Sequence, residues 1–533
     1  MRAIAWLALS VVATVVLLPT AGQVAAQQPQ SQEARVNLLT QGEPDSLDPA
    51  RASFAFASEG AIVRQVFEPL LRLDEQLTPQ PAAAESYDVS PDGRLVTFHL
   101  RPDGRWSDGQ PVTAAQFEFA WQRLLDPSRK SDYAAFFVSA GIDSVQTLDD
   151  LTFQVRLKQS FGPFPDLAAL WVAVPVRPDI IAANPDGWAH DTTTYIGNGP
   201  FVASEWVHQD HITLTPSPTY AAHGGWPKAT LSRLTVSMVS SGEADLAAFI
   251  SGERDWVQVA DADVNQVLND ATLAAQARQY NELTTFWVQL NNTRGALGNV
   301  TVRRALSKGL DRTALVRDLA TGISVPTTSI LPRGMPGYQA SLGRELEFDP
   351  AGARSLLAQA ALDSSHPLTF SYPRGQAFQR RAEYLQAQWK QNLGLDIQLA
   401  TMETRAYQQA ISEKNYDLAF GGWGADYPDP QDWFGTLFSC AGVFNVYNYC
   451  NPTFDQMVAR ADTATALDDR LQQYAQAQTI LMQDVPVVPL FMRGRLVLIK
   501  PWVRSVDGGP LPITAQDDYP GSLFLDKAQI LPH

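Results

Sequence analysis

Strand-like and helix-like patterns alternate along this 533-residue chain, and no internal repeat, heptad run or low-complexity linker separates them. Apolar residues recur at helical spacing in residues 302–319, 351–361 and 378–392. The stretches LDIQLA (395–400) and RLVLIK (495–500) are typical of strands. Mixed α/β regions without a flexible linker predict lobes that pack together, with the chain crossing between them more than once.

Composition and charge exclude several classes of protein. Hydrophobic residues make up 45% and charged residues 18% of the chain, which is too apolar for a disordered protein. The 56 acidic residues exceed the 40 basic ones, and without a basic cluster this argues against nucleic-acid binding. The P-loop, dinucleotide, nucleophile-elbow and HExxH motifs are absent and the seven His are scattered, so we name no catalytic residue, cofactor or metal ligand.

The beginning of the sequence has the pattern of a signal peptide. Arg2 precedes an apolar run from Ile4 to Leu18, and small residues then lead to a predicted cut after Ala26. The alternative, a membrane anchor, is disfavoured because the run is shorter than the ~20 residues of a spanning helix. No Cys stands at the cut to carry a lipid. We therefore expect an exported, soluble protein, periplasmic in a source with two membranes.

The chain has two cysteines, Cys440 and Cys450, too few for a disulfide scaffold or a four-Cys zinc site. Export makes a disulfide between them possible, because the compartment outside the inner membrane is oxidising. The alternative is a pair of reduced, buried thiols.

The segment ADYPDPQDW carries three acidic residues, Asp426, Asp429 and Asp432. Its two Pro and missing Gly differ from a calcium-binding EF-hand loop. A catalytic pair stays open at this point, because the separation of two carboxylates is a three-dimensional quantity. A solvated turn also fits Asp-Tyr-Pro-Asp-Pro.

Four segments occur in an order that is similar to one protein family: Glu43–Pro49 (EPDSLDP), Arg105–Ala114 (RWSDGQPVTA), Gly197–Phe201 (GNGPF) and Gly422–Pro430 (GWGADYPDP). With supporting stretches such as VRRALSKGLDR and WKQNLGLDI, the likeness runs from about residue 36 to 503. The chain resembles the extracellular solute-binding proteins, family 5, of bacterial peptide ABC importers, the oligopeptide- and dipeptide-binding type.

The resemblance implies an α/β fold of the two-lobed periplasmic-binding-protein (Venus flytrap) type, with an extra subdomain in the first lobe and hinge closure over the ligand. We expect a signal peptide followed by two lobes with these boundaries: signal peptide 1–26; lobe I 27–65, 195–285 and 505–533; inserted subdomain 66–194; lobe II 286–504.

The implied function is capture of short peptides and their delivery to an inner-membrane permease with its ATPase subunits. The resemblance implies a monomer that is not an enzyme. Two alternatives stay open from the sequence. One is the same receptor with an oligosaccharide, opine or metal chelate as ligand, and the other is an exported hydrolase using Asp426 with Asp429 or Asp432.

The resemblance also implies how a peptide would bind, by pairing its backbone with the receptor as an added strand. By position in the motif, Gly422 and Gly424 match the strand-pairing residues of one lobe. Three residues after SLDP match those of the other lobe: Ser53, Phe54 and Ala55. Glycine suits a place where a foreign backbone approaches closely.

Asp426 matches the family's acidic residue that pairs with the ligand's α-amino group, a charge-assisted bond that fixes register. Trp423, Phe286 and Trp287 are predicted to line the cleft as aromatic walls.

The sequence departs from the family at the far end of the ligand. Phe378, Ile411 and Phe420 stand where the oligopeptide-binding type has basic or His residues that meet a C-terminal carboxylate. This departure leaves open the preferred peptide length and the recognition of a free C-terminus.

Overall fold

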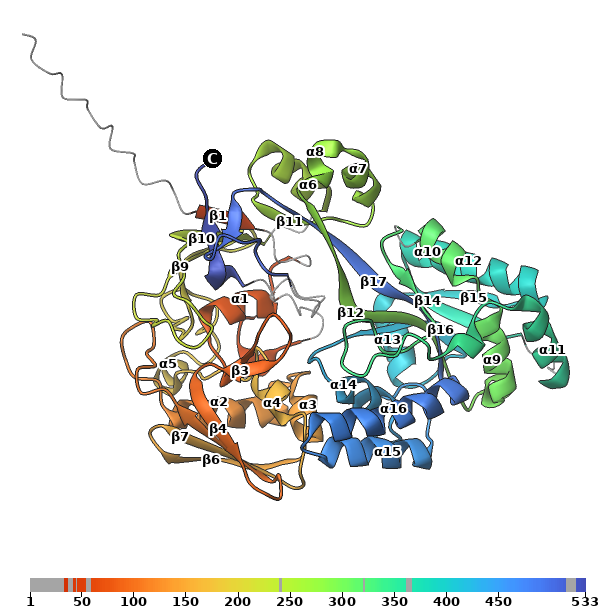
Figure 1. Cartoon of the computed structure of the whole chain (residues 1–533), viewed down its shortest axis with the longest axis horizontal. Coiled ribbons are helices and arrows are strands. Elements are labelled where there is room, and N and C mark those ends of the chain that lie inside the picture. Colours follow the sequence, from red (N-terminus) through yellow and green to blue (C-terminus); the bar gives the residue numbers. More distant parts are fainter. Residues whose placement is uncertain are drawn as a thin grey trace, which may run out of the picture.

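The computed structural model describes residues 33–36, 42–44, 46–53, 59–238, 242–319, 322–360, 367–513 and 524–533. Two lobes lie side by side and are joined by long strands (Figure 1). The predicted signal peptide, Phe54 and Ala55 lie outside the described residues. In the part of the chain that the structure describes, no helix is both long and apolar enough to cross a membrane.

One large sheet passes through both lobes in the strand order β15-β14-β16-β12-β17-β11-β1-β10-β9-β8, with β13 paired to β17. The first lobe contributes β1 (Glu33–Val36), β8 (Phe201–Val207), β9 (His211–Pro216), β10 (Arg233–Ser237) and β11 (Trp256–Gln258). The second lobe contributes β13 (Val325–Pro326), β14 (Thr369–Pro373), β15 (Gln398–Met402) and β16 (Leu418–Gly424). The sheet is mixed, since β1 and β10, and β14 with its two neighbours, are parallel pairs.

Two long strands, β12 (Ala277–Leu290) and β17 (Val487–Ile499), carry the chain between the lobes. The first part of β12 pairs with the end of β17, which also pairs with β11 of the first lobe. The last part of β12 pairs with β16 of the second lobe, and the register is irregular between Asn281 and Thr285. The predicted boundary between residues 285 and 286 falls within β12, and we propose the second crossing within β17, in place of residue 504.

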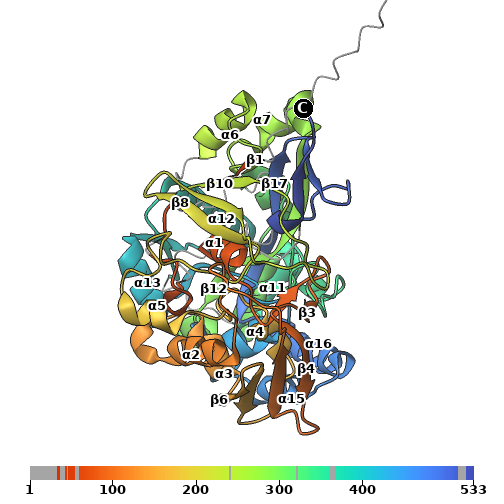
Figure 2. The same ribbon diagram turned by 90° about the vertical axis from the view of Figure 1, so that its left-hand side faces the viewer.

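The inserted subdomain is built around an antiparallel sheet in the order β4-β5-β7-β6. Its elements are β4 (Ala84–Val89), β5 (Leu95–Leu100), α2 (Ala114–Leu125), α3 (Ala134–Ser139), β6 (Ile142–Asp149), β7 (Thr152–Leu157), α4 (Phe164–Ala168) and α5 (Pro178–Ala183). Alternating burial along β5 and β7 gives this sheet one apolar face, and Trp121 of α2 packs on Phe153 with ring centroids 5.4 Å apart. The subdomain lies at the opposite end of the molecule from α6 (Gly242–Ser251), α7 (Val264–Asn269) and α8 (Ala271–Ala274) (Figure 2).

Helices cover both faces of the second-lobe sheet and form two apolar cores. One core is covered by α9 (Val300–Lys308), α10 (Arg312–Leu319), α11 (Pro350–Ala360) and α12 (Gln376–Leu393). The other core is covered by α14 (Gln431–Trp433), α15 (Pro452–Thr463) and α16 (Leu467–Asp484). The segment predicted to be helical over 302–319 forms two helices: α9 ends at Lys308 with Gly309 as its C-cap, and α10 begins at Arg312. A Cβ at Gly309 would lie 2.7 Å from Leu393.

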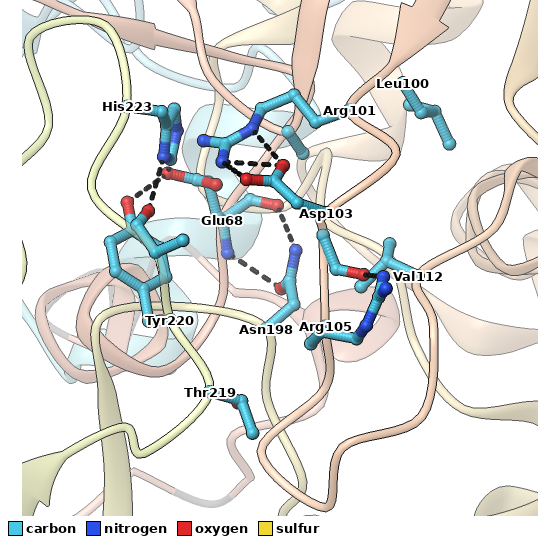
Figure 3. Close-up of a pocket in the computed structure, with 13 residues that line it drawn as sticks. Glu68, Leu100, Arg101, Asp103, Arg105, Val112, Asn198, Thr219, Tyr220 and His223 are labelled. Atoms are coloured by element: carbon cyan, nitrogen blue, oxygen red, sulfur yellow. Dashed lines mark hydrogen bonds and ion pairs between the residues drawn. The ribbon is translucent and has the colours of Figure 1, made fainter.

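The first lobe, the subdomain and the C-terminal segment meet at Glu68, which follows α1 (Glu59–Val66) (Figure 3). The Tyr220 hydroxyl donates to Glu68 at 2.6 Å, and Arg72 joins Glu68 to Asp526 of the C-terminal segment. Burial raises the pKa of Glu68 to about 7. The cavity beside it has about 20 Å³ of free space, enough for one water but no peptide residue. We interpret this network as a structural junction.

The remaining short strands are β2 (Leu71–Leu73), β3 (Pro79–Pro81), β18 (Val503–Ser505) and β19 (Ala528–Ile530).

Candidate functional site at the junction of the lobes

Strand β16 has one side that is only partly paired. On one side, β12 accompanies it along its whole length, from Leu418 to Gly424. On the other side, β14 pairs with Leu418 and Ala419. Among the described residues, no strand pairs with positions 420–424 on that side. An unpaired sheet edge is a template for another extended chain.

The main-chain hydrogen bonds of β16 show which residues face this edge. The N–H of Ala425 donates to the carbonyl of Leu283 on β12 at 2.9 Å. At the other end of the strand, the N–H of Asn291 donates to the carbonyl of Asp417 at 3.0 Å. Main-chain groups of odd-numbered residues therefore point towards β12, and those of even-numbered residues point the other way.

Phe420, Gly422 and Gly424 are the even-numbered residues of the open stretch. The Phe420 carbonyl already accepts a hydrogen bond of 2.7 Å from the hydroxyl of Tyr407 on α13 (Thr404–Ser412). By the same alternation, the N–H and C=O groups of Gly422 and Gly424 are directed at the open edge. These are the two glycines that the sequence motif singles out.

Gly421 and Gly422 lack side chains for a packing reason. A Cβ at Gly422 would lie 2.7 Å from the ring of Phe286, closer than real Cβ atoms approach. At Gly421 a Cβ would lie 2.6 Å from the indole nitrogen of Trp287. The β12 side chains thus occupy the space that residues with a Cβ would need on β16.

Asp426 follows β16 directly and is 5% exposed. Its N–H donates to Oδ2 of Asp432 at 2.9 Å, and the same oxygen accepts from Nε1 of Trp423 at 3.1 Å. Burial and the neighbouring charge of Asp426 raise the pKa of Asp432 well above its ordinary value. Asp432 therefore braces the turn and positions both Asp426 and Trp423.

The third acidic residue of this segment, Asp429, is also engaged. It forms a buried ion pair with Arg470 of α16 and accepts the N–H of Gln431 at 2.9 Å. Asp429 and Asp432 are thus both engaged in holding the turn, Asp429 by its ion pair and Asp432 by its hydrogen bonds. The arrangement therefore gives no support to the hydrolase alternative.

Aromatic side chains link this turn to the first lobe. Trp423 packs on Phe444 with ring centroids 5.4 Å apart, and Phe444 packs on Phe136 of α3 at 6.0 Å. Phe136 also meets Tyr427 edge to face at 5.6 Å. Sequence reasoning missed Phe136 and Phe444, because no local pattern relates residues so far apart in the chain.

The two aromatic residues predicted on β12 have different environments. Phe286 is partly exposed, 5.2 Å from Phe491, and the Arg493 guanidinium lies 5.7 Å from its ring centre. Trp287 is fully buried against Trp433 in the second-lobe core. Trp287 is therefore not a cleft wall, and we remove it from the proposed ligand contacts.

Ser53 belongs to the first lobe and is held by two acidic residues. Its N–H donates to Glu59 at 3.2 Å, and its hydroxyl donates to Asp132 at 3.1 Å. Asp132 lies two residues before α3, the helix that carries Phe136. Ser53 is thus connected to the helix that faces the Asp426 turn.

The far end of the β16 edge is apolar. Phe378 on α12 is 38% exposed, and its ring centroid lies 5.9 Å from that of Phe420. Ile411, the third departure from the family, lies on α13.

A cavity of about 610 Å³ lies between the α7 segment and the second lobe. Its lining residues include Asp261, Arg317 and Arg380. Its size is within the range of small-ligand sites, ~300–1,000 Å³.

Cys440 and Cys450 are joined by a disulfide, and the loop that it closes carries Phe444. Replacing both cysteines by Ala is expected to lower the free energy of unfolding by about 2.5–3 kcal/mol, because the unfolded chain regains loop entropy. Urea unfolding of the double variant and the parent protein measures this difference. A change below about 1 kcal/mol would contradict the expectation.

Within the described ranges, no three His, Cys, Asp or Glu side chains gather as metal ligands.

The fold, together with the partly unpaired strand β16 at the lobe junction, defines a two-lobed solute-binding protein. The model of the bacterial extracellular solute-binding proteins, family 5 middle, matches residues 78–445, and the chain belongs to this family.

Relatives with similar sequences or structures span almost the whole chain. The chain is 29% identical over 522 residues to the "Probable deoxycholate-binding periplasmic protein YgiS" of Escherichia coli K12, with 94% of each chain covered. It is 30% identical over 490 residues to the "Periplasmic oligopeptide-binding protein OppA" of Salmonella typhimurium, covering 87% of this chain and 88% of the relative. The unliganded open form of the MppA periplasmic murein tripeptide binding protein matches with a TM-score of 0.79 and 26% identity, over 95% of this chain and 98% of that one.

These findings confirm the predicted family and the two-lobed α/β fold. All three proteins are named as binding proteins rather than enzymes, which fits a chain without a catalytic motif.

Proposed function

We propose that this chain is the periplasmic substrate-binding component of an ABC importer, which captures short peptides between its lobes and delivers them to a membrane permease. One observation carries the proposal: the open edge of β16 directs main-chain groups of Gly422 and Gly424 outward, and buried Asp426 follows directly. The names of the OppA and MppA relatives support peptides as the ligand class.

A peptide backbone would extend the sheet at this edge. Main-chain hydrogen bonds to Gly422 and Gly424 would then supply affinity that does not depend on the peptide's sequence. Phe286 packs where a Cβ of residue 422 would lie, so this position stays glycine and presents no side chain to an approaching backbone. Broad tolerance of peptide sequence follows.

Asp426 would fix the register of the bound peptide. Its carboxylate is buried and its main chain is braced by Asp432, so its position is defined before a ligand binds. A charge-assisted hydrogen bond to the ligand's ammonium group is stronger than a neutral one and favours peptides with a free N-terminus.

At the opposite end of the β16 edge, Phe378 and Phe420 favour a different kind of ligand group. Their rings form an apolar, partly exposed surface, which suits an apolar side chain of the ligand. The same surface makes a non-peptide solute with an apolar face the second candidate ligand. The YgiS relative is named as a probable deoxycholate-binding protein, and deoxycholate is an amphipathic solute of this kind.

Native mass spectrometry separates these two ligands. The mature protein is purified from its periplasm without denaturation, and any released molecules are fragmented. A ladder of short peptides is the expected result. A steroid, sugar or other solute in their place would keep the receptor and refute the peptide assignment.

A further inference from the structure

The two lobes also touch away from the β16 edge, where the inserted subdomain meets α15 and α16 (Figures 1 and 2). The N–H of Gly162, two residues before α4, donates to the carbonyl of Asp462 on α15 at 2.7 Å. A Cβ at Gly162 would lie 2.3 Å from the Ala464 carbonyl oxygen and 2.7 Å from Cδ of Arg470. The main chain of the subdomain is therefore pressed directly against the second lobe.

A turn of the subdomain makes another contact with the second lobe. Leu77, between β2 and β3, packs against the apolar core that α15 and α16 cover. Its backbone is in the left-handed conformation with φ 61°. The turn is held by Asp74, whose Oδ1 accepts the N–H groups of Gln76 and Thr78 at 2.9 Å each. Because α4 packs on β2, the contacts of Leu77 and Gly162 come from neighbouring elements.

Each side of this contact is anchored in its own lobe. Phe161 and Phe164, on either side of Gly162, are buried in the core that the subdomain shares with the rest of the first lobe. On the other side, Arg470 is 5% exposed and forms an ion pair with Asp429, on the turn after β16. The subdomain therefore moves with the first lobe, and the surface that it meets moves with the second.

The contact lies away from the strands that join the lobes. The chain passes between the lobes in β12 and β17, and the subdomain meets α15 and α16 at some distance to one side of them (Figure 1). Rotation about a hinge displaces atoms in proportion to their distance from it. Even a small opening of the lobes would therefore draw Gly162 away from Asp462 and break their hydrogen bond.

We propose that the inserted subdomain is a clasp of the closed state. When the lobes close, Leu77 docks on the second-lobe core and Gly162 docks on Asp462, Ala464 and Arg470, and these contacts hold the lobes together. The clasp rests on the proposed function, because ligand capture is what closes the lobes. It goes beyond that function by making affinity depend on a subdomain surface away from the β16 edge.

The clasp has a thermodynamic signature. A ligand that binds the closed state has an apparent affinity proportional to the population of that state. A change at the clasp alters this population and leaves the ligand's own contacts intact. Different ligands should therefore lose affinity by the same factor, whereas a change in the ligand pocket would distinguish between them.

Gly162→Ala adds a methyl group that the closed state alone disfavours. The backbone of Gly162 lies outside the left-handed region, so alanine can adopt its conformation. The three atoms nearest to the added Cβ all belong to the second lobe. We expect the tripeptides Ala-Ala-Ala and Ala-Ala-Phe to bind this variant about tenfold more weakly than the parent protein, each by the same factor. Isothermal titration measures both affinities, and small-angle X-ray scattering follows the compaction that accompanies binding.

Leu77→Gly tests the clasp without introducing a clash. It removes the apolar contact, and glycine favours the left-handed conformation of the turn, so the turn itself is kept. We expect both tripeptides to bind about fivefold more weakly. Gly225→Ala is the control, because a Cβ there would meet nothing within 4 Å, and it should bind like the parent protein. Circular dichroism checks that each variant is folded.

Unchanged affinity in a folded Gly162→Ala protein would overturn the clasp and leave peptide capture intact. Factors that differ between the two tripeptides would also overturn it, because the altered residue would then belong to the ligand pocket. If Gly162→Ala does not fold, Leu77→Gly decides by the same two criteria. A parent protein that neither binds nor compacts with either tripeptide would overturn the peptide function, and the clasp with it.

Discussion

Asp426→Asn is expected to weaken the binding of peptides with a free α-amino group by about 100-fold, or about 3 kcal/mol. Asn keeps the shape of the side chain but removes the negative charge that would face the ligand's ammonium group. The main-chain N–H of residue 426 donates to Oδ2 of Asp432, and the substitution leaves this hydrogen bond in place, so the turn itself is preserved. Isothermal titration with a tripeptide measures the change.

N-acetylated peptides are the control ligands for this experiment, because they lack the ammonium charge. The parent protein should bind them weakly, and Asp426→Asn should bind them no worse. If the variant binds free-amine tripeptides as tightly as the parent protein, then Asp426 does not recognise the amine.

Gly422→Ala is expected to lower peptide affinity by about tenfold, equivalent to about 1.4 kcal/mol. The added Cβ would sit 2.7 Å from the Phe286 ring, so either the ring or the strand edge must move. Overpacking of this kind typically costs ~1–3 kcal/mol, and here it displaces the edge that would pair with the ligand.

Gly225→Ala is the control, since a Cβ there would meet nothing within 4 Å. Circular dichroism checks that both variants are folded before their affinities are compared. Unchanged affinity in a folded Gly422→Ala protein would show that the ligand does not use this edge.

Much of the fold could be predicted from the sequence, because helix and strand periodicity is local. The helix predicted over 378–392 is α12, and Gly394 ends it in the left-handed conformation with φ 72°. The break between α9 and α10 was missed, although its signals are local: Gly309 caps α9, and Asp311 accepts the N–H of Ala314 at the start of α10.

Part of the candidate site could be predicted from the sequence, and part could not. Gly422, Gly424 and Asp426 share one short motif, so sequence alone brought them together. Trp287 was misplaced because Phe286 and Trp287 are neighbours on a strand and point to opposite faces, and the sequence does not show which face is the core.

Contacts between the lobes were beyond sequence reasoning altogether. Phe136 and Phe444 meet across more than half the chain, and so do Gly162 and Asp462, which share a main-chain hydrogen bond. Such pairs are set by how the lobes pack, and no local pattern encodes that arrangement.

The most direct test of peptide capture by strand addition is a crystal structure of the protein with a bound tripeptide. Capture by strand addition predicts main-chain hydrogen bonds from the peptide to Gly422 and Gly424, with its α-amino nitrogen within hydrogen-bonding distance of Asp426. A peptide bound elsewhere, or held without main-chain pairing to β16, would contradict it.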